Sequence, residues 1–175
     1  SLELVSFGMS NDFGENWRAS TVLGGTPGAA ISTRDVDNNV APLVLDVAHN
    51  PHAAAHLASN LDNMGFFTAT WAVFGAMRDK DLAGIIGHLR ERVDHWLPVA
   101  LPGARAAGTD ELMAALARAG AGPDAQRTVE PFATPREALV HAQSRAEEGD
   151  RIVVFGSFLT VADVLAWRRT SGGTR

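Results

Sequence analysis

An acid, a histidine, an asparagine and a proline fall close together in the stretch "LVLDVAHNPHAAAHL" at 43–57. Asp46 and His49 follow a continuous apolar run, and Asn50 and Pro51 come next. Asparagine is a favoured helix N-cap, and proline suits the first helical position because its missing N–H would have no partner within the helix. The stretch therefore predicts a strand that turns into a helix, with a carboxylate and an imidazole at the corner.

In an open α/β sheet such a corner lies at the carboxyl end of its strand, where ligands bind, and the free amides of a helix start favour anions. We expect Asp46 and His49 to project near that crevice. The alternative is that Asp46 caps a turn while His49 packs locally, and the spacing alone leaves both interpretations open.

His52 and His56 stand four residues apart, which places them on one face of the predicted helix. This is the spacing of a two-histidine metal site, but "HAAAH" lacks the glutamate that follows the first histidine in zinc peptidases. We therefore interpret both as solvent-exposed histidines and predict no metal site.

Two further stretches have the form of a strand that ends at a helix start. In "FGAMRDKDLAG" at 74–84, Lys80 could reach a phosphate, but the local sequence favours the alternative that Asp79, Lys80 and Asp81 simply cap and solvate a helix start. In "VVFGSFLTVADVL" at 153–165, Ser157 with nearby amides could hold a carboxylate, and a tight turn of purely structural role is the alternative. Ser157 is not in a Gly-x-Ser-x-Gly setting, so a hydrolase nucleophile has little support.

The elements that would position these corners repeat one pattern, a short apolar run followed by a helical period. The apolar runs lie at 43–48, 70–75, 95–100, 127–132 and 151–156. The helical patterns lie at 51–63, 80–92, 109–119, 134–147 and 159–169. Such alternation predicts an α/β fold of three layers, with a mostly parallel, twisted sheet of about six strands between helices.

The two ends of the chain do not follow this pattern. "LELVSF" at 2–7 alternates like a half-buried strand, whereas the polar, glycine-rich segment 7–41 is expected to be a loop insertion that sits outside the sheet, as a mobile segment or a surface hairpin. The last residues, 170–175, are expected to be a disordered tail.

Composition bounds the class of protein. The 175 residues fit a single domain, 1–175, and the 15 basic against 20 acidic residues form no basic stripe, so we predict no nucleic-acid partner. No segment approaches the ~20 apolar residues of a membrane helix, which argues against a membrane partner. Cysteine is absent, which excludes thiolate chemistry and fits the cytoplasm. Neither a phosphate-binding G-x-x-x-x-G-K-[ST] loop nor a G-x-G-x-x-G stretch after a strand occurs.

Four ordered blocks together resemble the C-terminal domain of the Mur ligase superfamily, most nearly that of bacterial bifunctional dihydrofolate synthase/folylpolyglutamate synthase. These blocks are "LDVAHNPHAA" at 45–54, "GAMRDKDLAG" at 75–84, "VDHWLPVALPGARAA" at 93–107 and "GSFLTVADVL" at 156–165. The family domain begins with an edge strand, which "LELV" at 2–5 resembles, and we expect that strand to lie antiparallel at the sheet edge. About 35 residues then intervene before the "DVAHNP" strand, where the family runs almost directly on.

The resemblance implies a role for each corner in an ATP-dependent ligase. Asp46, Asn50 and Lys80 would contact the nucleotide, and His49 would lie at the reaction centre as the catalytic residue. Ser157 and Phe158 would place the incoming glutamate. Leu159 stands where close relatives carry a histidine, which weakens any acid/base role at that position.

The resemblance also implies partners. An N-terminal ATPase domain of the same chain would hold ATP and Mg²⁺, and the substrates would be L-glutamate and dihydropteroate or tetrahydrofolate. The enzyme would be a monomer, and this domain alone would be inactive. Two competing hypotheses are a stand-alone, flavodoxin-like binding or signalling module, which the strand–helix alternation also permits, and a histidine-based metallohydrolase.

Overall fold

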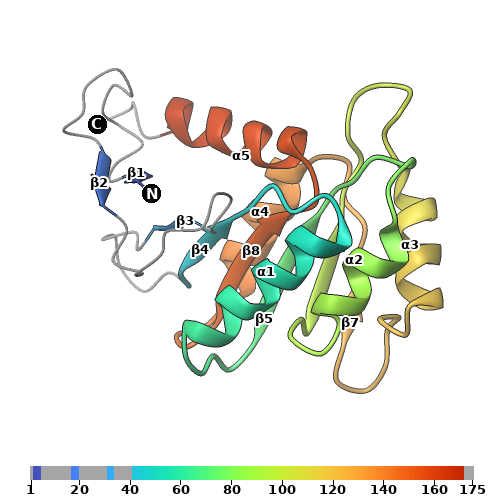
Figure 1. The fold of residues 1–175 in the computed structure, drawn as a ribbon, viewed down its shortest axis with the longest axis horizontal. Helices are drawn as coiled ribbons and strands as arrows, with labels where there is room; N and C mark the ends of the chain where they lie inside the picture. Colours follow the sequence, from blue (N-terminus) through green and yellow to red (C-terminus); the bar gives the residue numbers. More distant parts are fainter. Residues whose placement is uncertain (1, 5–16, 20–30, 34–40, 172–175) are drawn as a thin grey trace.

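The computed structural model describes residues 2–4, 17–19, 31–33 and 41–171. A twisted sheet of six strands forms the centre of the fold, in the order β3-β4-β8-β5-β6-β7 (Figure 1). Its strands are β3 (Ile31–Thr33), β4 (Leu43–Leu45), β5 (Thr70–Phe74), β6 (His95–Pro98), β7 (Thr128–Val129) and β8 (Arg151–Phe155). From β4 to β7 all neighbours run parallel, and the α/β class and the approximate strand number predicted from the sequence are confirmed.

The central strands are apolar because helices cover both faces of the sheet. Every residue of β8 is buried, and in the register Val44 pairs with Val153 and Val153 with Ala72. Parallel strands covered on both sides have no solvent-facing positions, so they consist of continuous runs of apolar residues rather than alternating ones. This is the physical origin of the apolar runs in the sequence.

In the part of the chain that the structure describes, five helices form the outer layers: α1 (Pro51–Asn63), α2 (Leu82–Leu89), α3 (Thr109–Arg118), α4 (Pro135–Arg145) and α5 (Phe158–Ser171). Helices α1, α2 and α3 share one hydrophobic core with one face of the sheet, while α4 and α5 pack in a second core on the other face. Figure 1 shows α1 and α2 in front of the sheet and α4 behind it. None of the helices in these ranges is both long and apolar enough to cross a membrane.

Polar caps fix where the helices begin. The side-chain oxygen of Asn50 accepts a hydrogen bond from the amide of Ala53 at 2.9 Å, and Pro51 is the first residue of α1, as predicted. Asp81 caps α2 in the same way. Helix α2 was predicted at 80–92 but is shorter, because the cap at Asp81 sets its start and the helix ends at Leu89.

The N-terminal part of the chain differs from the prediction. The strand expected at the edge of the sheet, β1 (Leu2–Leu4), instead pairs with β2 (Trp17–Ala19) in a separate two-stranded sheet. The strand that pairs antiparallel with β4 is β3, which belongs to the segment 7–41 that we expected outside the sheet. Isoleucine and threonine favour extended backbone, and pairing satisfies the outer backbone groups of β4.

The remaining predictions for the chain ends fall mostly outside the described residues. We predicted that 7–41 is mobile or forms a surface hairpin. Apart from β2, β3 and residue 41, this segment lies outside the described residues. Helix α5 continues through Ser171, past the expected start of the tail at 170, and residues 172–175 lie outside the described part.

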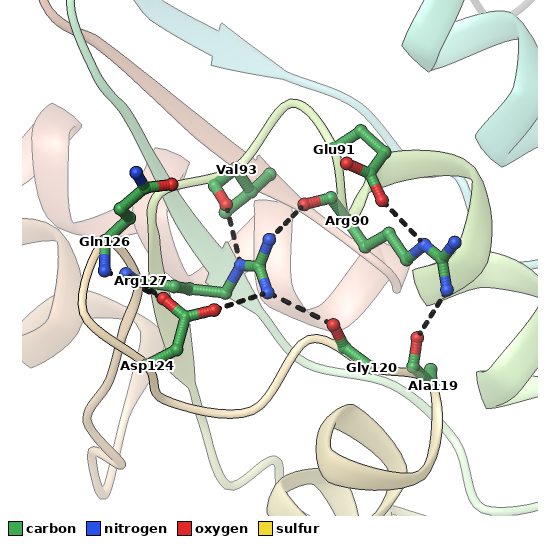
Figure 2. Close-up of polar contacts among 8 residues, drawn as sticks. All are labelled: Arg90, Glu91, Val93, Ala119, Gly120, Asp124, Gln126 and Arg127. Atoms are coloured by element: carbon green, nitrogen blue, oxygen red, sulfur yellow. Dashed lines mark hydrogen bonds and ion pairs between the residues drawn. The ribbon is translucent and has the colours of Figure 1, made fainter.

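Arg127 links the loops that follow α2 and α3, near strand β7 at the edge of the sheet. Figure 2 shows the guanidinium of Arg127 among backbone carbonyls, to which it donates hydrogen bonds: Arg90 O at 3.2 Å, Gly120 O at 3.1 Å and Val93 O at 3.4 Å. The carboxylate of Asp124 adds an ion pair at 3.4 Å. Carbonyls at the ends of α2 and α3 have no partners within their helices, so a single cation here serves both helix ends.

Candidate functional site

The polar residues singled out in the sequence lie along one edge of the sheet, at the carboxyl ends of its parallel strands. We call 46–50, which follows β4, the first corner; 75–81, which follows β5, the second corner; and 156–159, which follows β8, the third corner. Because β8 pairs with β4 on one side and β5 on the other, the third corner lies between the other two.

Asp46 is buried at the first corner, with 6% of its surface exposed. Its Oδ1 accepts a hydrogen bond from the amide of Ala48 at 2.8 Å, and within the described ranges no other hydrogen bond reaches this carboxylate. Burial raises the pKa of Asp46 to about 6, against the opposing effect of the Ala48 hydrogen bond. The carboxylate therefore has unused acceptor capacity in a place where ionisation is costly, as expected for a group that awaits a donor from a ligand.

His49 is exposed beside Asp46, and its ring has a fixed orientation. Its Nδ1 lies 2.9 Å from the carbonyl oxygen of Val47. A carbonyl can only accept, so Nδ1 carries a proton and Nε2 is left to exchange a proton or bind a ligand. The geometry is thus compatible with the reaction-centre role that the resemblance implied.

Asn50 is committed to local structure. Its side-chain oxygen caps α1, while its amide NH₂ group makes no hydrogen bond within the described residues. At this corner the structure therefore supports the capping interpretation, and the NH₂ group could still donate to a ligand.

Lys80 at the second corner is ion-paired in this structure. Its Nζ lies 3.5 Å from Oδ2 of Asp79, and the same oxygen accepts a hydrogen bond from Arg105 at 3.0 Å. The hydrogen bond from Arg105 is the main cause that lowers the pKa of Asp79. Asp81, as described, caps α2. The three charges thus make the local contacts that were the alternative interpretation, and contact of Lys80 with a phosphate stays a prediction.

Ser157 and Phe158 differ in exposure at the third corner. The Ser157 hydroxyl is buried and accepts a hydrogen bond from the amide of Leu159 at 3.0 Å, which leaves its own proton free to be donated. Phe158 is the first residue of α5 and is 72% exposed. A donor beside an exposed aromatic ring suits a carboxylate ligand that is partly covered by apolar surface.

Two glycines allow the second and third corners to touch. Gly156 has φ +104°, and a Cβ there would lie 2.6 Å from the carbonyl oxygen of Gly75. A Cβ on Gly75 would in turn lie 2.8 Å from Oγ1 of Thr160, whose hydroxyl donates to the Gly75 carbonyl at 2.9 Å. Side chains at either glycine would push the corners apart, so Ser157 is held in position by backbone contact.

Thr160 was missed by sequence reasoning. It is fully buried one turn into α5 and joins that helix to the second corner. The available signal was its place in "GSFLT", three residues after Ser157, but a hydroxyl in an apolar helix does not reveal its partner.

A largely apolar groove with a cavity volume of about 660 Å³ adjoins the third corner. Its walls are Ala100, Leu101, Pro102, Ala133, Thr134, Pro135, Leu159, Ala162 and Asp163. The Asp163 carboxylate accepts a hydrogen bond from the amide of Arg136 at 3.1 Å. The groove was not predicted, because it is built from three segments that are distant in the sequence and only the packing of α4 against α5 brings them together.

The two histidines of α1 follow the first corner along the chain. Both are exposed, and their Nε2 atoms are 3.1 Å apart. Among the residues that the structure describes, no group of three or more His, Cys, Asp or Glu is placed to hold a metal ion.

Comparison with known proteins identifies relatives of this site. A family model for the Mur ligase, glutamate ligase domain, matches residues 33–158. The dihydrofolate synthase/folylpolyglutamate synthase of Escherichia coli (strain K12) is 34% identical over 133 residues, which are 75% of this chain and 29% of that protein. The protein of the same name from Haemophilus influenzae is 35% identical over 126 residues, 71% of this chain and 28% of that protein.

Solved structures agree with the sequence comparison. E. coli FolC in complex with ADP superimposes with a TM-score of 0.68 at 30% identity, covering 79% of this chain and 31% of FolC. A bifunctional folylpolyglutamate synthase/dihydrofolate synthase with Mn, AMPPNP and L-glutamate bound gives a TM-score of 0.65 at 34% identity, covering 83% of this chain and 32% of that one. The chain thus spans less than a third of the length of these relatives. The likeness favours a ligase domain over a flavodoxin-like module.

Proposed function

Because the chain belongs to the Mur ligase family of glutamate ligase domains, we propose that it is the C-terminal domain of an ATP-dependent ligase. The ligase adds L-glutamate to dihydropteroate or to a folate, in folate biosynthesis and polyglutamylation. The γ-phosphate of ATP is transferred to the substrate carboxylate, and the glutamate amino group then attacks this acyl phosphate. An amide bond forms as inorganic phosphate leaves.

One observation carries the proposal: β4 and β8 are paired neighbours, so the first and third corners adjoin. Leu45 pairs with Val154, and the amide of Asp46 donates to the Val154 carbonyl at 3.0 Å. In the proposal, Asp46 binds the nucleotide, His49 acts at the reaction centre, and Ser157 with Phe158 places the glutamate. Reactants held at adjoining corners meet in the geometry that transfer of a phosphoryl or acyl group requires.

The residues at these corners could bind one end of a nucleotide, but they do not form a binding site for its phosphates. Asp46 offers a buried carboxylate to a hydroxyl donor, and His49 offers Nε2 at the surface. Lys80 would have to leave Asp79 before it could bind a phosphate. We therefore propose that ATP and Mg²⁺ are held mainly by an N-terminal ATPase domain of the same chain, and the greater length of the relatives supports this.

This division of labour makes the domain a lid. An acyl phosphate is lost to hydrolysis if water reaches it, so closure of one domain on the other protects the intermediate while completing the site. We further propose that the enzyme acts as a monomer in the cytoplasm.

The proposal is tested by ligase assays on two proteins. In the first, this chain alone should form no ADP in the presence of ATP, dihydropteroate and L-glutamate. In the second, which we call the graft, this chain replaces the matching C-terminal segment of the E. coli relative. The graft should release ADP only when both dihydropteroate and L-glutamate are present. Ligation by the chain alone, or a soluble graft without activity, would contradict the proposal.

A further inference from the structure

The histidine pair on α1, which the sequence analysis interpreted as two solvent-exposed residues, has a geometry that the proposed function does not use. His52 and His56 occupy the first two turns of the helix, on its exposed side. Their rings meet edge to face with centroids 4.6 Å apart, and the Nε2 atoms are 3.1 Å apart. The two exposed ring nitrogens are therefore close enough together for one ion to reach both.

The separation of the nitrogens agrees with chelation. Two zinc–nitrogen bonds of about 2.05 Å that enclose an angle of about 98° place their nitrogens about 3.1 Å apart. This angle lies between the right angle of square-planar or octahedral coordination and the wider tetrahedral angle, so ions with any of these geometries fit with small ring movements. A hydrogen bond between two neutral rings would give a similar distance, and it leaves the same nitrogens available when an ion competes for them.

We propose that His52 and His56 form a two-ligand site for a borderline divalent transition-metal ion, namely Zn²⁺, Ni²⁺ or Cu²⁺. Imidazole suits these ions, whereas Mg²⁺ prefers oxygen ligands. Water or a carboxylate or phosphate oxygen from a partner fills the remaining positions. This inference does not rest on the proposed function.

An ion at this site acts on the start of α1. Asn50 caps that helix at the first corner, so a chelate across its first two turns stabilises the helix start against fraying. The positive end of the helix dipole opposes a bound cation, and with only two protein ligands we expect reversible binding.

The test is isothermal titration of ZnCl₂ and NiCl₂ into the whole chain, purified without a histidine tag, with MgCl₂ as a negative control. One ion should bind per chain, and His52→Ala and His56→Ala should each weaken Zn²⁺ binding by at least about tenfold. His88→Ala removes an exposed histidine of α2 and should leave the affinity unchanged. Both substitutions on α1 put a better helix former at an exposed position, so the variants should fold.

Proton NMR of the histidine rings gives a second measurement. Zn²⁺ should shift the ring resonances of His52 and His56 while those of His88 stay in place, and it should raise the melting temperature of the wild type only. Equal Zn²⁺ affinity in the wild type and both α1 variants would overturn the proposal. So would one ion bound per two chains, because the site would then bridge molecules rather than form within one.

Discussion

The two edges of the central sheet treat their buried polar groups in opposite ways. At the amino ends of the strands, the guanidinium of buried Arg151 donates to Oγ1 of Thr70 at 2.9 Å and to the carbonyl of Leu61 at 2.6 Å. At the carboxyl ends, the buried carboxylate of Asp46 accepts one hydrogen bond from the described residues, that of the Ala48 amide. Arg151 is thus satisfied by partners within the domain, whereas the Asp46 carboxylate keeps acceptor capacity that a ligand can use.

The same contrast extends to neighbouring groups. Asp150, also at the amino edge, accepts from the indole of Trp71 at 3.1 Å and from the amide of Glu147 at 3.0 Å. Ser157 at the carboxyl edge keeps its hydroxyl proton free beside a Phe158 ring that solvent reaches. Asp46 and Ser157 are both buried and both keep hydrogen-bonding capacity at the carboxyl ends of neighbouring strands, which supports a functional site there.

Of the substitutions considered, removal of Arg151 at the amino ends of the strands should reduce stability the most. Arg151→Met removes two hydrogen bonds from a charged donor, one to the Thr70 hydroxyl and one to the Leu61 carbonyl, which keeps only the Met64 amide at 3.4 Å. We expect the free energy of unfolding to fall by about 3 to 4 kcal/mol. Urea unfolding measures this, with Arg118→Met, at an exposed position on α3, as the control. Equal midpoints for the two variants would mean that the network at this edge contributes little.

At the carboxyl ends of the strands, replacement of Asp46 by asparagine should instead stabilise the chain. Burial holds the pKa of Asp46 near 6, above the 3.8 of the unfolded chain. Below about pH 4 the acid is protonated in both states, and from there to about pH 6 the unfolded state ionises first, so stability falls. Asp46→Asn should remove this fall and leave the variant more stable by up to about 3 kcal/mol at pH 7. Urea unfolding from pH 4 to 7 tests this, and parallel curves for both proteins would contradict it.

Substitutions at the first corner should also lower the ligase activity of the graft. His49→Ala removes the exposed imidazole, and we expect kcat to fall about hundredfold, as for loss of an acid or base. Asp46→Ala should also depress turnover strongly, although the domain remains folded. His88→Ala is the matched control. Wild-type kcat in both corner variants would mean that the first corner is only a capped helix start.

Ser157→Ala should have the smallest effect and a different signature. Loss of one hydrogen bond to a charged group is worth about 1.5 to 3 kcal/mol, so the KM for L-glutamate should rise roughly ten- to hundredfold. The KM for ATP should hardly move, because another corner binds the nucleotide. Steady-state kinetics of the graft separate the two constants, with Ser144→Ala on α4 as control, and a rise in the KM for ATP alone would reverse the assignment.

The difference between the edges explains what could be predicted from the sequence. Helix α1 was predicted at 51–63, which are its observed bounds. The prediction was possible because the cap at Asn50 and the proline after it act on neighbouring residues. The strand β3 was missed because its place depends on pairing with β4, a contact that local propensity does not encode. The raised pKa of Asp46 was equally hidden, since spacing places a carboxylate at a corner but does not determine how deeply the helices bury it.

The Arg127 side chain has a consequence for digestion by proteases. Trypsin cleaves after an arginine only when its specificity pocket can take in the side chain. The guanidinium of Arg127 already binds the carbonyls of Arg90, Val93 and Gly120, so the peptide bond after it should survive while the domain is folded. Cutting there would require the loops after α2 and α3 to separate together. A tryptic fragment that ends at Arg127 would thus report the opening of this whole edge of the sheet.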